Sequence, residues 1–407
     1  MSSQSVKKPS VDKRIGERER GYVQEVLDSQ FRSSAGSVMT KRLETKFAEV
    51  FQSKFAISFI NGTATLHAAL AAAGVGPGDE VIVPPLTMSS TAFAVLHAGA
   101  VPVFADIDRD TWTIDPASVL ACVTPRTKAI IPVAIYGLSS DLDAIMEIAR
   151  RHSLFVLDDV AQCVLGSCRG RIVGSVAHAS SFSFQSSKHI TSGEGGMVTT
   201  NDAQLAERIR RFNSLGYGAV GAGKAKISKS EIQDPTYERH ISVGWNYRMP
   251  ELCAAVLLGQ VERIHELVAA RVANASLYLD ALRSCDWLTA QHVPDDFVHS
   301  YWTFVARLNG KRNVAWRDFH SKYTEMGGDG IYGAWQLTYL EPAFRGKKLS
   351  PGQRQELGPG LCPVAESVQP TLLQFKTNYL DPAIAETKAA ALVRTIQHFN
   401  SRAAGAA

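Results

Sequence analysis

The stretch SFQSSKHITSGEGG, residues 183–196, places a single lysine among hydroxyl side chains and follows it with a nearly bare backbone. The preceding apolar pattern is typical of a strand, so Lys188 is expected to project where the chain turns back. The glycines after it let backbone approach a ligand closely. A surface lysine would be the ordinary interpretation. The alternative is a desolvated amine near another cation, which attacks carbonyl carbon near neutral pH.

Before this stretch, short apolar runs alternate with helical patterns. Strands apolar on both faces and joined by helices predict an α/β fold with a mostly parallel central sheet covered by helices on both faces. Ligands of such sheets bind at the carboxyl ends of the strands, and the polar residues gather there. The runs expected to form strands are 55–60, 80–85, 101–107, 117–123, 128–137 and 154–160.

The chain divides by pattern into three parts. Residues 1–20 are polar and are predicted to form a mobile N-terminal tail, and residues 21–260 a large domain. A long helix over 250–284 is expected to lead into a smaller α/β C-terminal domain, residues 261–407. Residues 216–240, rich in Gly and Lys, are predicted to form a surface loop.

Composition excludes several classes of protein. The 407 residues include 43 basic and 39 acidic side chains, a formal charge of +4, too little to predict nucleic-acid binding. No apolar run reaches the ~18 residues of a membrane span. The six cysteines are scattered without metal-ligand spacing, so no metal site is expected, and reduced thiols in the cytoplasm are the default.

The segment from Asn61 to Thr65, NGTAT, lies between an apolar run and a helical pattern. Small residues at a helix N-terminus leave N–H groups and the positive end of the helix dipole open to an anion. A simple N-cap explains the same residues. The segment alone does not decide between the two interpretations.

The motif LDDVAQ, residues 157–162, ends another apolar run with two carboxylates. A metal site would need a further ligand at suitable spacing, and none is present. Solvated surface acids are a second interpretation. A third is a carboxylate that keeps an adjacent ring nitrogen protonated. Together, an anion cradle, such a carboxylate and an activated lysine favour pyridoxal phosphate over other common cofactors.

Several longer segments carry a resemblance to a known family. The chain resembles the DegT/StrS aminotransferases, the sugar aminotransferase branch of the fold-type I pyridoxal-phosphate enzymes, from about Gly21 to the C-terminal helix. The segments that carry it are NGTATLHAALAAAGVGPGDEVIVPPLT, GAVPVFADID, PVAIYGLSSDLDAI, VLDDVAQ, SFSFQSSKHITSGEGGMVTT and GWNYRMPELCAA.

The resemblance implies catalytic roles for two residues. Lys188 is expected to hold the cofactor as an imine and, once released, to move the proton between the cofactor and the substrate carbon. Asp159 is expected to pair with the pyridine nitrogen and keep the ring an electron sink. Gln162 is implied to lie beside the ring and its 3′ oxygen.

The resemblance also implies phosphate ligands. Backbone and hydroxyl groups of Gly62, Thr63 and Ala64, together with Ser183, are expected to hold the phosphate of the cofactor. Asn246, in GWNYRM, is implied to reach that phosphate from the partner subunit. A homodimer with shared active sites is therefore expected.

Three positions depart from the family pattern. Met88 stands where an aromatic residue often stacks on the pyridine ring, and it can still pack there. Gln185 replaces a common histidine, a change associated with the cyclitol and aminohydroxybenzoate branches, and Ala134 replaces another. The segments 326–344 and 372–379 fit the family loosely. These departures leave the acceptor open.

The favoured function is transfer of an amino group from glutamate or glutamine to a keto-sugar, most simply a nucleotide-linked one, in amino-sugar biosynthesis. A free keto-cyclitol such as an inosose, or dehydration on the way to an aminobenzoate, are the alternatives. The basic run GKAKISKS, with Arg239 and His240, either grips a diphosphate or is a solvated loop. A purely regulatory role is disfavoured because Lys188, Asp159 and Gln162 are all present.

Overall fold

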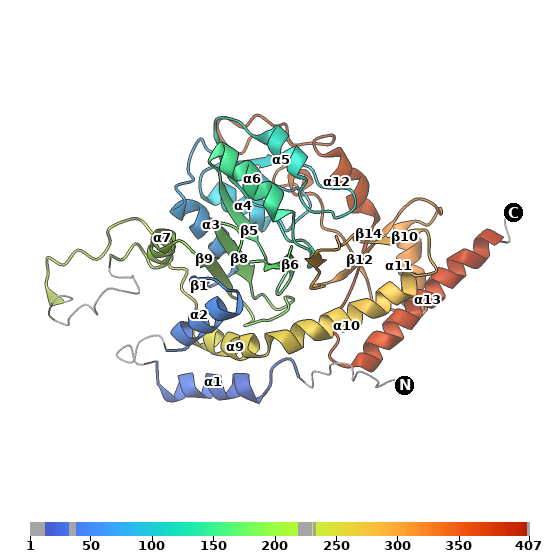
Figure 1. The fold of residues 1–407 in the computed structure, drawn as a ribbon, viewed down its shortest axis with the longest axis horizontal. Helices are drawn as coiled ribbons and strands as arrows, with labels where there is room; N and C mark the ends of the chain where they lie inside the picture. The colour runs from blue at the N-terminus through green and yellow to red at the C-terminus, as the bar shows by residue number, and fades with distance from the viewer. Residues whose placement is uncertain (1–12, 32–37, 219–229, 231–232, 405–407) are drawn as a thin grey trace.

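A computed structural model describes residues 13–31, 38–218, 230 and 233–404. Its centre is a seven-stranded sheet of order β1-β9-β8-β5-β4-β2-β3, in which β9 alone runs antiparallel to the others (Figure 1). The predicted mostly parallel α/β sheet is therefore confirmed. The strands are β1 (Phe55–Phe59), β2 (Glu80–Val83), β3 (Val101–Phe104), β4 (Thr127–Ile130), β5 (Phe155–Asp159), β8 (Ala179–Ser183) and β9 (Gly196–Thr200).

Helices cover both faces of this sheet, which explains why its strands are apolar on both sides. On β2, Val81 and Val83 pack into the cluster that contains α3, α4 and α7, whereas Ile82 packs against α6 on the other face. The helices of the first face are α3 (Gly62–Ala72), α4 (Ser90–His97) and α7 (Ala203–Asn213). Those of the second face are α2 (Val38–Val50), α5 (Pro116–Cys122), α6 (Leu142–His152) and α9 (Glu251–Glu262).

One predicted strand is wrong. The apolar run 117–123 forms most of helix α5 instead. Asp115 caps this helix, because its side chain accepts hydrogen bonds from the N–H groups of Ala117 and Ser118, and Pro116 occupies the first turn. Capping chemistry therefore outweighs the short apolar run, which periodicity alone cannot distinguish from a strand.

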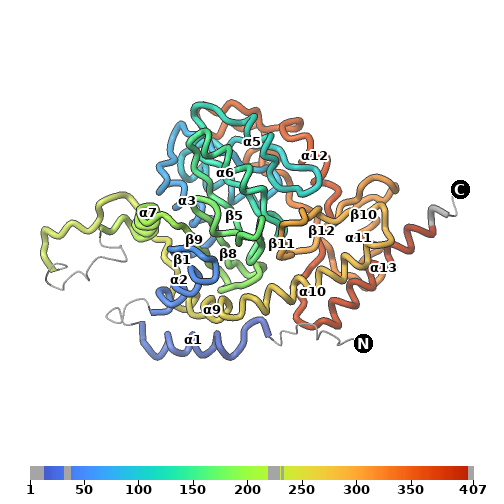
Figure 2. Tube along the Cα trace, viewed as in Figure 1, coloured from blue at the N-terminus to red at the C-terminus, as the bar shows by residue number. Residues whose placement is uncertain are grey.

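The predicted long helix over 250–284 is two helices, α9 and α10 (Ile264–Leu282), which meet at Arg263. Helix α1 (Glu17–Asp28) packs along α9 (Figure 2) and begins within the predicted tail. Residues 17–20 of that tail belong to this helix and Arg14 contacts the turn at Lys188, whereas residues 1–12 lie outside the described residues. The mobility of the tail stays a prediction. Among the described residues, no helix is long and apolar enough to cross a membrane.

A second sheet of order β10-β12-β14-β13 lies beyond α10, with α11 and α13 packed on it. The segment 334–368 leaves this sheet and joins the core of the large one, so the two units share contacts. The division at residue 260 stays a prediction.

The remaining elements are β6 (Ser167–Cys168), β7 (Arg171–Ile172), β10 (Leu288–Ala290), β11 (Phe297–Val298), β12 (Phe304–Leu308), α11 (Trp316–Glu325), β13 (Tyr332–Gly333), η2 (Thr338–Leu340), α12 (Pro363–Val368), η3 (Gln369–Thr371), β14 (Leu372–Phe375) and α13 (Pro382–Ala404).

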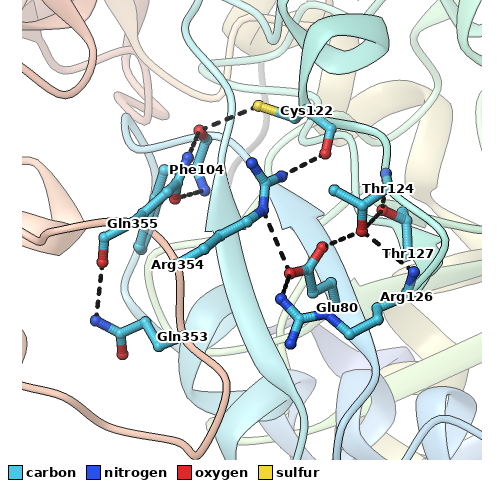
Figure 3. A network of polar contacts seen from close by, with 9 residues as sticks. All are labelled: Glu80, Phe104, Cys122, Thr124, Arg126, Thr127, Gln353, Arg354 and Gln355. Atoms are coloured by element: carbon cyan, nitrogen blue, oxygen red, sulfur yellow. Dashed lines mark hydrogen bonds and ion pairs between the residues drawn. The ribbon is translucent and has the colours of Figure 1, made fainter.

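Residues 350–357, here called the edge segment, bind the large sheet through a buried acid (Figure 3). The side chain of Glu80, at the start of β2, is fully buried. It accepts a hydrogen bond of 2.6 Å from Thr124 and forms ion pairs with Arg126 at 2.6 Å and Arg354 at 3.3 Å. Because a buried carboxylate needs such partners, Glu80 ties the edge segment to the sheet.

The edge segment also bonds to the open edge of β3, the outer strand of the sheet. The side-chain amide of Gln355 accepts from the N–H of Phe104 at 2.7 Å and donates to its carbonyl at 2.9 Å, as a neighbouring strand would. Gln353 donates in turn to the carbonyl of Gln355. Figure 3 shows the two sets of contacts side by side.

Candidate active site

A cavity of about 400 Å³ lies at the carboxyl ends of the central strands. It brings together seven of the nine residues predicted for the site, from four separate segments of the chain. Those seven are Gly62, Thr63, Met88, Asp159, Gln162, Ser183 and Lys188. Ala64 and Asn246 do not line it.

Lys188 lies in the turn between β8 and β9, and its side chain is buried. Its N–H donates to the carbonyl of Gln185 at 2.9 Å, and Phe184 donates to Gly195 where the chain returns. Burial lowers the pKa of Lys188 to about 8; the charge of Asp159 opposes this shift and that of Arg271 adds to it. An amine with such a pKa is partly neutral near pH 7, as a nucleophile requires.

Asp159 is the last residue of β5 and is buried. Thr91 donates to one carboxylate oxygen at 3.0 Å and the N–H of Ala161 to the other at 3.2 Å. Burial raises the pKa of Asp159, whereas these hydrogen bonds and the charge of Lys188 lower it. Burial outweighs the other contributions, so the pKa of Asp159 is raised overall. A protonated ring nitrogen placed beside this carboxyl would favour its ionised form, because opposite charges stabilise each other in a buried site.

The N-terminus of α3 has the cap that one interpretation of NGTAT predicts, and its geometry is compatible with the anion site that the other predicts. The side chain of Asn61 accepts from the N–H of Ala64 at 2.9 Å, and its carbonyl accepts from Thr65. The N–H groups of Gly62 and Thr63 come before the first bond of the helix, so they remain open to an anion at the cavity. Asn61 is thus the cap, and the N–H of Ala64, a predicted phosphate ligand, is already occupied.

Close packing explains the glycine at position 62. A Cβ placed there would lie 2.9 Å from the Cβ of Ser183, on the neighbouring strand end. Only glycine lets the start of α3 approach Ser183 this closely, and this approach forms one wall of the cavity. The sequence predicted both residues as phosphate ligands.

Gln162 and Met88 form further parts of the wall. The side-chain oxygen of Gln162 accepts from the N–H of Tyr136 at 2.9 Å, which fixes the amide beside Asp159. Met88 is half exposed and lines the opening.

The sequence did not predict the residues that approach Lys188 from other parts of the chain. Arg271, on α10, donates to the carbonyls of Ser187 at 3.1 Å and Lys188 at 2.9 Å. Arg14, in the N-terminal segment, donates to the carbonyl of Lys188 at 2.7 Å. These partners lie more than 80 residues from Lys188, so no local pattern could have revealed them.

The remaining predicted residues lie away from this cavity. Asn246 is exposed and pairs with Ser214 in an isolated bridge. His240 is exposed and its ring contacts the carbonyl of Leu215. The basic run GKAKISKS lies outside the described residues except for its last serine.

The donors of this cavity fit pyridoxal phosphate. Open N–H groups at a helix N-terminus suit a phosphate, a buried carboxylate suits the ring nitrogen, and an amine of lowered pKa suits the aldehyde. The parallel sheet with these groups at its carboxyl edge defines a fold-type I pyridoxal-phosphate enzyme.

Residues 13–374 match the DegT/DnrJ/EryC1/StrS aminotransferase family, and the chain belongs to it. The family's aminotransferases are dependent on pyridoxal phosphate, so the predicted family, enzyme class and cofactor are confirmed. The resemblance stated from the sequence therefore holds across most of the chain.

Three known proteins illustrate what this chain is similar to. GDP-perosamine synthase of Caulobacter vibrioides is 41% identical over 297 residues, 72% of this chain and 76% of that one. A putative L-glutamine:3-amino-2,3-dideoxy-scyllo-inosose aminotransferase of Streptoalloteichus tenebrarius is 42% identical over 273 residues, 66% and 62% of the two chains. The solved aminotransferase of Psychrobacter cryohalolentis superimposes with a TM-score of 0.84 at 31% identity, covering 95% of this chain and 98% of that one.

Proposed function

We propose that this enzyme transfers an amino group from glutamate or glutamine to the ketone of a nucleotide-linked sugar, in amino-sugar biosynthesis. The observation that carries the proposal is the meeting of Lys188, Asp159 and the open N-terminus of α3 around one cavity. The relatedness to a GDP-perosamine synthase supports a nucleotide-linked keto-sugar as the acceptor.

Each residue of the cavity has a part in this proposal. Pyridoxal phosphate, when bound, supplies the electron sink and the temporary carrier of the amino group. Gly62, Thr63 and Ser183 hold its phosphate, and Asp159 holds a proton on its ring nitrogen. Lys188 Nζ, as a neutral amine, takes the proton from the substrate carbon and later returns one.

The role of Lys188 is tested by Lys188→Ala. We expect loss of turnover and of the absorbance band that the cofactor shows when bound to the lysine, because no other amine lines the cavity among the described residues. Lys128→Ala, at an exposed position of β4, is the matched control and should retain both. A Lys188→Ala enzyme that kept turnover and the band would refute the assignment.

The acceptor is tested with a panel of nucleotide-linked keto-sugars and free keto-cyclitols, each with glutamate and with glutamine, followed by mass change. Replacement of one carbonyl oxygen by an amino group in a nucleotide-linked product supports the proposal. Amination of free rings alone would reject the nucleotide-linked class.

A free keto-cyclitol is the second candidate acceptor. It is favoured by the 42% identity with a protein named as an inosose aminotransferase that uses L-glutamine. The same panel separates the two candidates, because a cyclitol enzyme should bind its acceptor equally well without a nucleotide.

We propose that the active enzyme is a homodimer in which Asn246 of one chain completes the site of the other. Asn246 is exposed and does not line the cavity that contains Lys188, and nearby Val243 is 88% exposed and Trp245 is 51% exposed. Exposed apolar side chains of this size are typical of a protein interface. The cytoplasmic location expected from the sequence stays a prediction.

A further inference from the structure

Two tryptophans next to strands of the second sheet line the same cavity as the predicted cofactor residues. Trp302 precedes β12 and Trp335 follows β13. Their ring centroids lie 6.0 Å apart and the planes are tilted by 34°. Because the rings are not stacked on each other, each is free to present part of a face to a ligand.

The two rings differ in how they are held. The indole N–H of Trp302 donates to the carbonyl of Ser187 at 2.9 Å, and Lys188 Nζ lies 4.6 Å from the centre of its ring. Trp302 therefore helps to position the Lys188 side chain. The indole N–H of Trp335 makes no hydrogen bond among the described residues, although the ring is half-buried beside the cavity.

The backbone just before Trp335 is held by side chains from η3 and β14. Gln369 donates to the carbonyl of Ala334 at 3.1 Å, and Gln374 donates to that of Gly333 at 2.8 Å. An unpartnered donor on a fixed aromatic ring at a cavity is a group available to a ligand.

We propose that Trp335 determines acceptor specificity by binding the ring that carries the keto group. Its face packs on the C–H surface of a six-membered polyol ring, and its N–H donates to a ring hydroxyl. This inference rests on the proposed function and specifies which part of the acceptor the enzyme recognises.

Distance favours the keto ring over a nucleotide as the occupant. Trp335 contacts Trp302, and Trp302 contacts Lys188 Nζ, where the reacting carbon must lie during proton transfer. The ring of Trp335 is thus one aromatic ring removed from Lys188, a separation that the six-membered ring carrying the ketone can span, whereas a nucleotide is joined to the far side of the sugar. Trp335 should act on nucleotide-linked and free rings alike.

The experiment compares Trp335→Ala and Trp335→Phe with Tyr332→Ala in the holoenzyme. Tyr332 is a neighbouring aromatic residue that is 61% exposed and outside the cavity, so its variant is the control. The donor half of the reaction is followed by the cofactor absorbance with glutamate, and the acceptor half by amination of each keto compound that the wild type accepts.

We expect Trp335→Ala to raise the acceptor KM at least about tenfold, since a hydrogen bond and an aromatic contact are lost. Trp335→Phe retains the apolar face and should raise KM about fivefold. The donor half-reaction should stay within twofold of wild type in both, as should every constant of Tyr332→Ala.

Three results would overturn the inference: an unchanged acceptor KM, an equal effect on both half-reactions, or an effect on nucleotide-linked acceptors alone. If the wild type aminates none of the compounds, the proposed function fails separately. Binding of scyllo-inosose and of a uridine diphosphate hexose to the holoenzyme is then measured by isothermal titration calorimetry. Weaker binding of both compounds to Trp335→Ala than to Tyr332→Ala supports the inference, and equal binding to the two variants overturns it.

Discussion

Two adjacent carboxylates illustrate how position on a strand decides chemistry. Asp159 faces the cavity and receives hydrogen bonds, whereas Asp158 points to the opposite face of β5, as alternation along a strand requires. Both oxygens of Asp158 are buried and make no hydrogen bond among the described residues. Burial, with a smaller effect from the charge of Asp159, raises the pKa of Asp158 to about 8.

This raised pKa predicts a pH-dependent stability. An unfolded aspartate has a pKa of about 3.9, so between that value and about 8 the folded chain retains a proton that the unfolded chain releases. The contribution of Asp158 is full below pH 4 and is lost as pH rises to about 8. Asp158→Asn removes it, so its melting temperature should fall less than that of wild type between pH 5 and pH 8.

Thermal unfolding at a series of pH values, monitored by circular dichroism, measures this difference. Asp295→Asn, at an exposed position, is the control and should follow the wild-type curve. If the curve of Asp158→Asn ran parallel to that of wild type, Asp158 would not retain a proton on folding.

Arg271 is predicted to set the pH range in which the amine of Lys188 is neutral. Its charge lowers the pKa of Lys188, so Arg271→Met should raise that pKa and reduce the neutral amine at a given pH. The pH profile for recombination of the apoenzyme with pyridoxal phosphate, read by absorbance, should move to higher pH. Arg271→Lys retains a charge but not the paired donors, so its profile should move less. An unmoved profile in Arg271→Met would limit Arg271 to a structural role.

At the scale of elements, local patterns predicted most strands of the large sheet. They failed where the residues at the end of a helix determine where it begins or stops. The alternation of apolar runs with helices gave β1, β2, β3, β4 and β5 because buried parallel strands are apolar throughout. Helix α5 was missed because the Asp115 cap outweighs a short apolar run. The break at Arg263 interrupts an otherwise continuous apolar pattern, so periodicity predicted one helix there.

The contacts of the edge segment predict a measurable contribution to stability. Glu80→Gln removes the charge between Arg126 and Arg354 while keeping the shape of the side chain. We expect the free energy of unfolding to fall by about 2 kcal/mol, less than for a fully buried pair because both arginines are partly exposed.

Urea unfolding of the holoenzyme measures this loss. Glu147→Gln is a matched control, because Glu147 pairs with two arginines on the exposed face of α6. Surface pairs contribute little, so the control should lose much less stability than Glu80→Gln. Equal losses in the two variants would contradict a special role for the buried acid.

At the scale of the whole molecule, sequence patterns predicted the part of the cavity that is formed by the large sheet. Lys188, Asp159 and Gly62 stand at strand ends within recognisable local patterns. Trp302 and Trp335 reach the cavity only because the second sheet packs against the first, and this depends on contacts far apart in the sequence. Such contacts leave no local period or motif.

The proposed shared site predicts complementation between two defective chains. Lys188→Ala and Asn246→Ala should each be weak alone, yet a mixed dimer contains one site with both native residues. After random subunit exchange, about a quarter of the wild-type activity is expected, since half of the dimers are mixed and each has one intact site. Activity of the exchanged mixture measures this.

A mixture of Lys188→Ala and Asp159→Asn is the control for exchange. Both residues line the cavity of the same chain, so no mixed dimer has an intact site. Recovery in the control, or none in the test mixture, would argue against Asn246 acting across the interface.

The two attachments on either side of Trp335 have an evolutionary consequence. Residues 334–354 leave the second sheet at β13, which pairs with β14, and end where Gln355 binds the edge of the large sheet. Within this stretch, Leu337, Tyr339 and Phe344 are buried in the core of the large sheet and Arg354 pairs with Glu80, so these positions tolerate little change. Trp335 belongs to neither set, so a substitution there lets a lineage acquire new acceptors while the fold, the amine and its cofactor residues stay untouched.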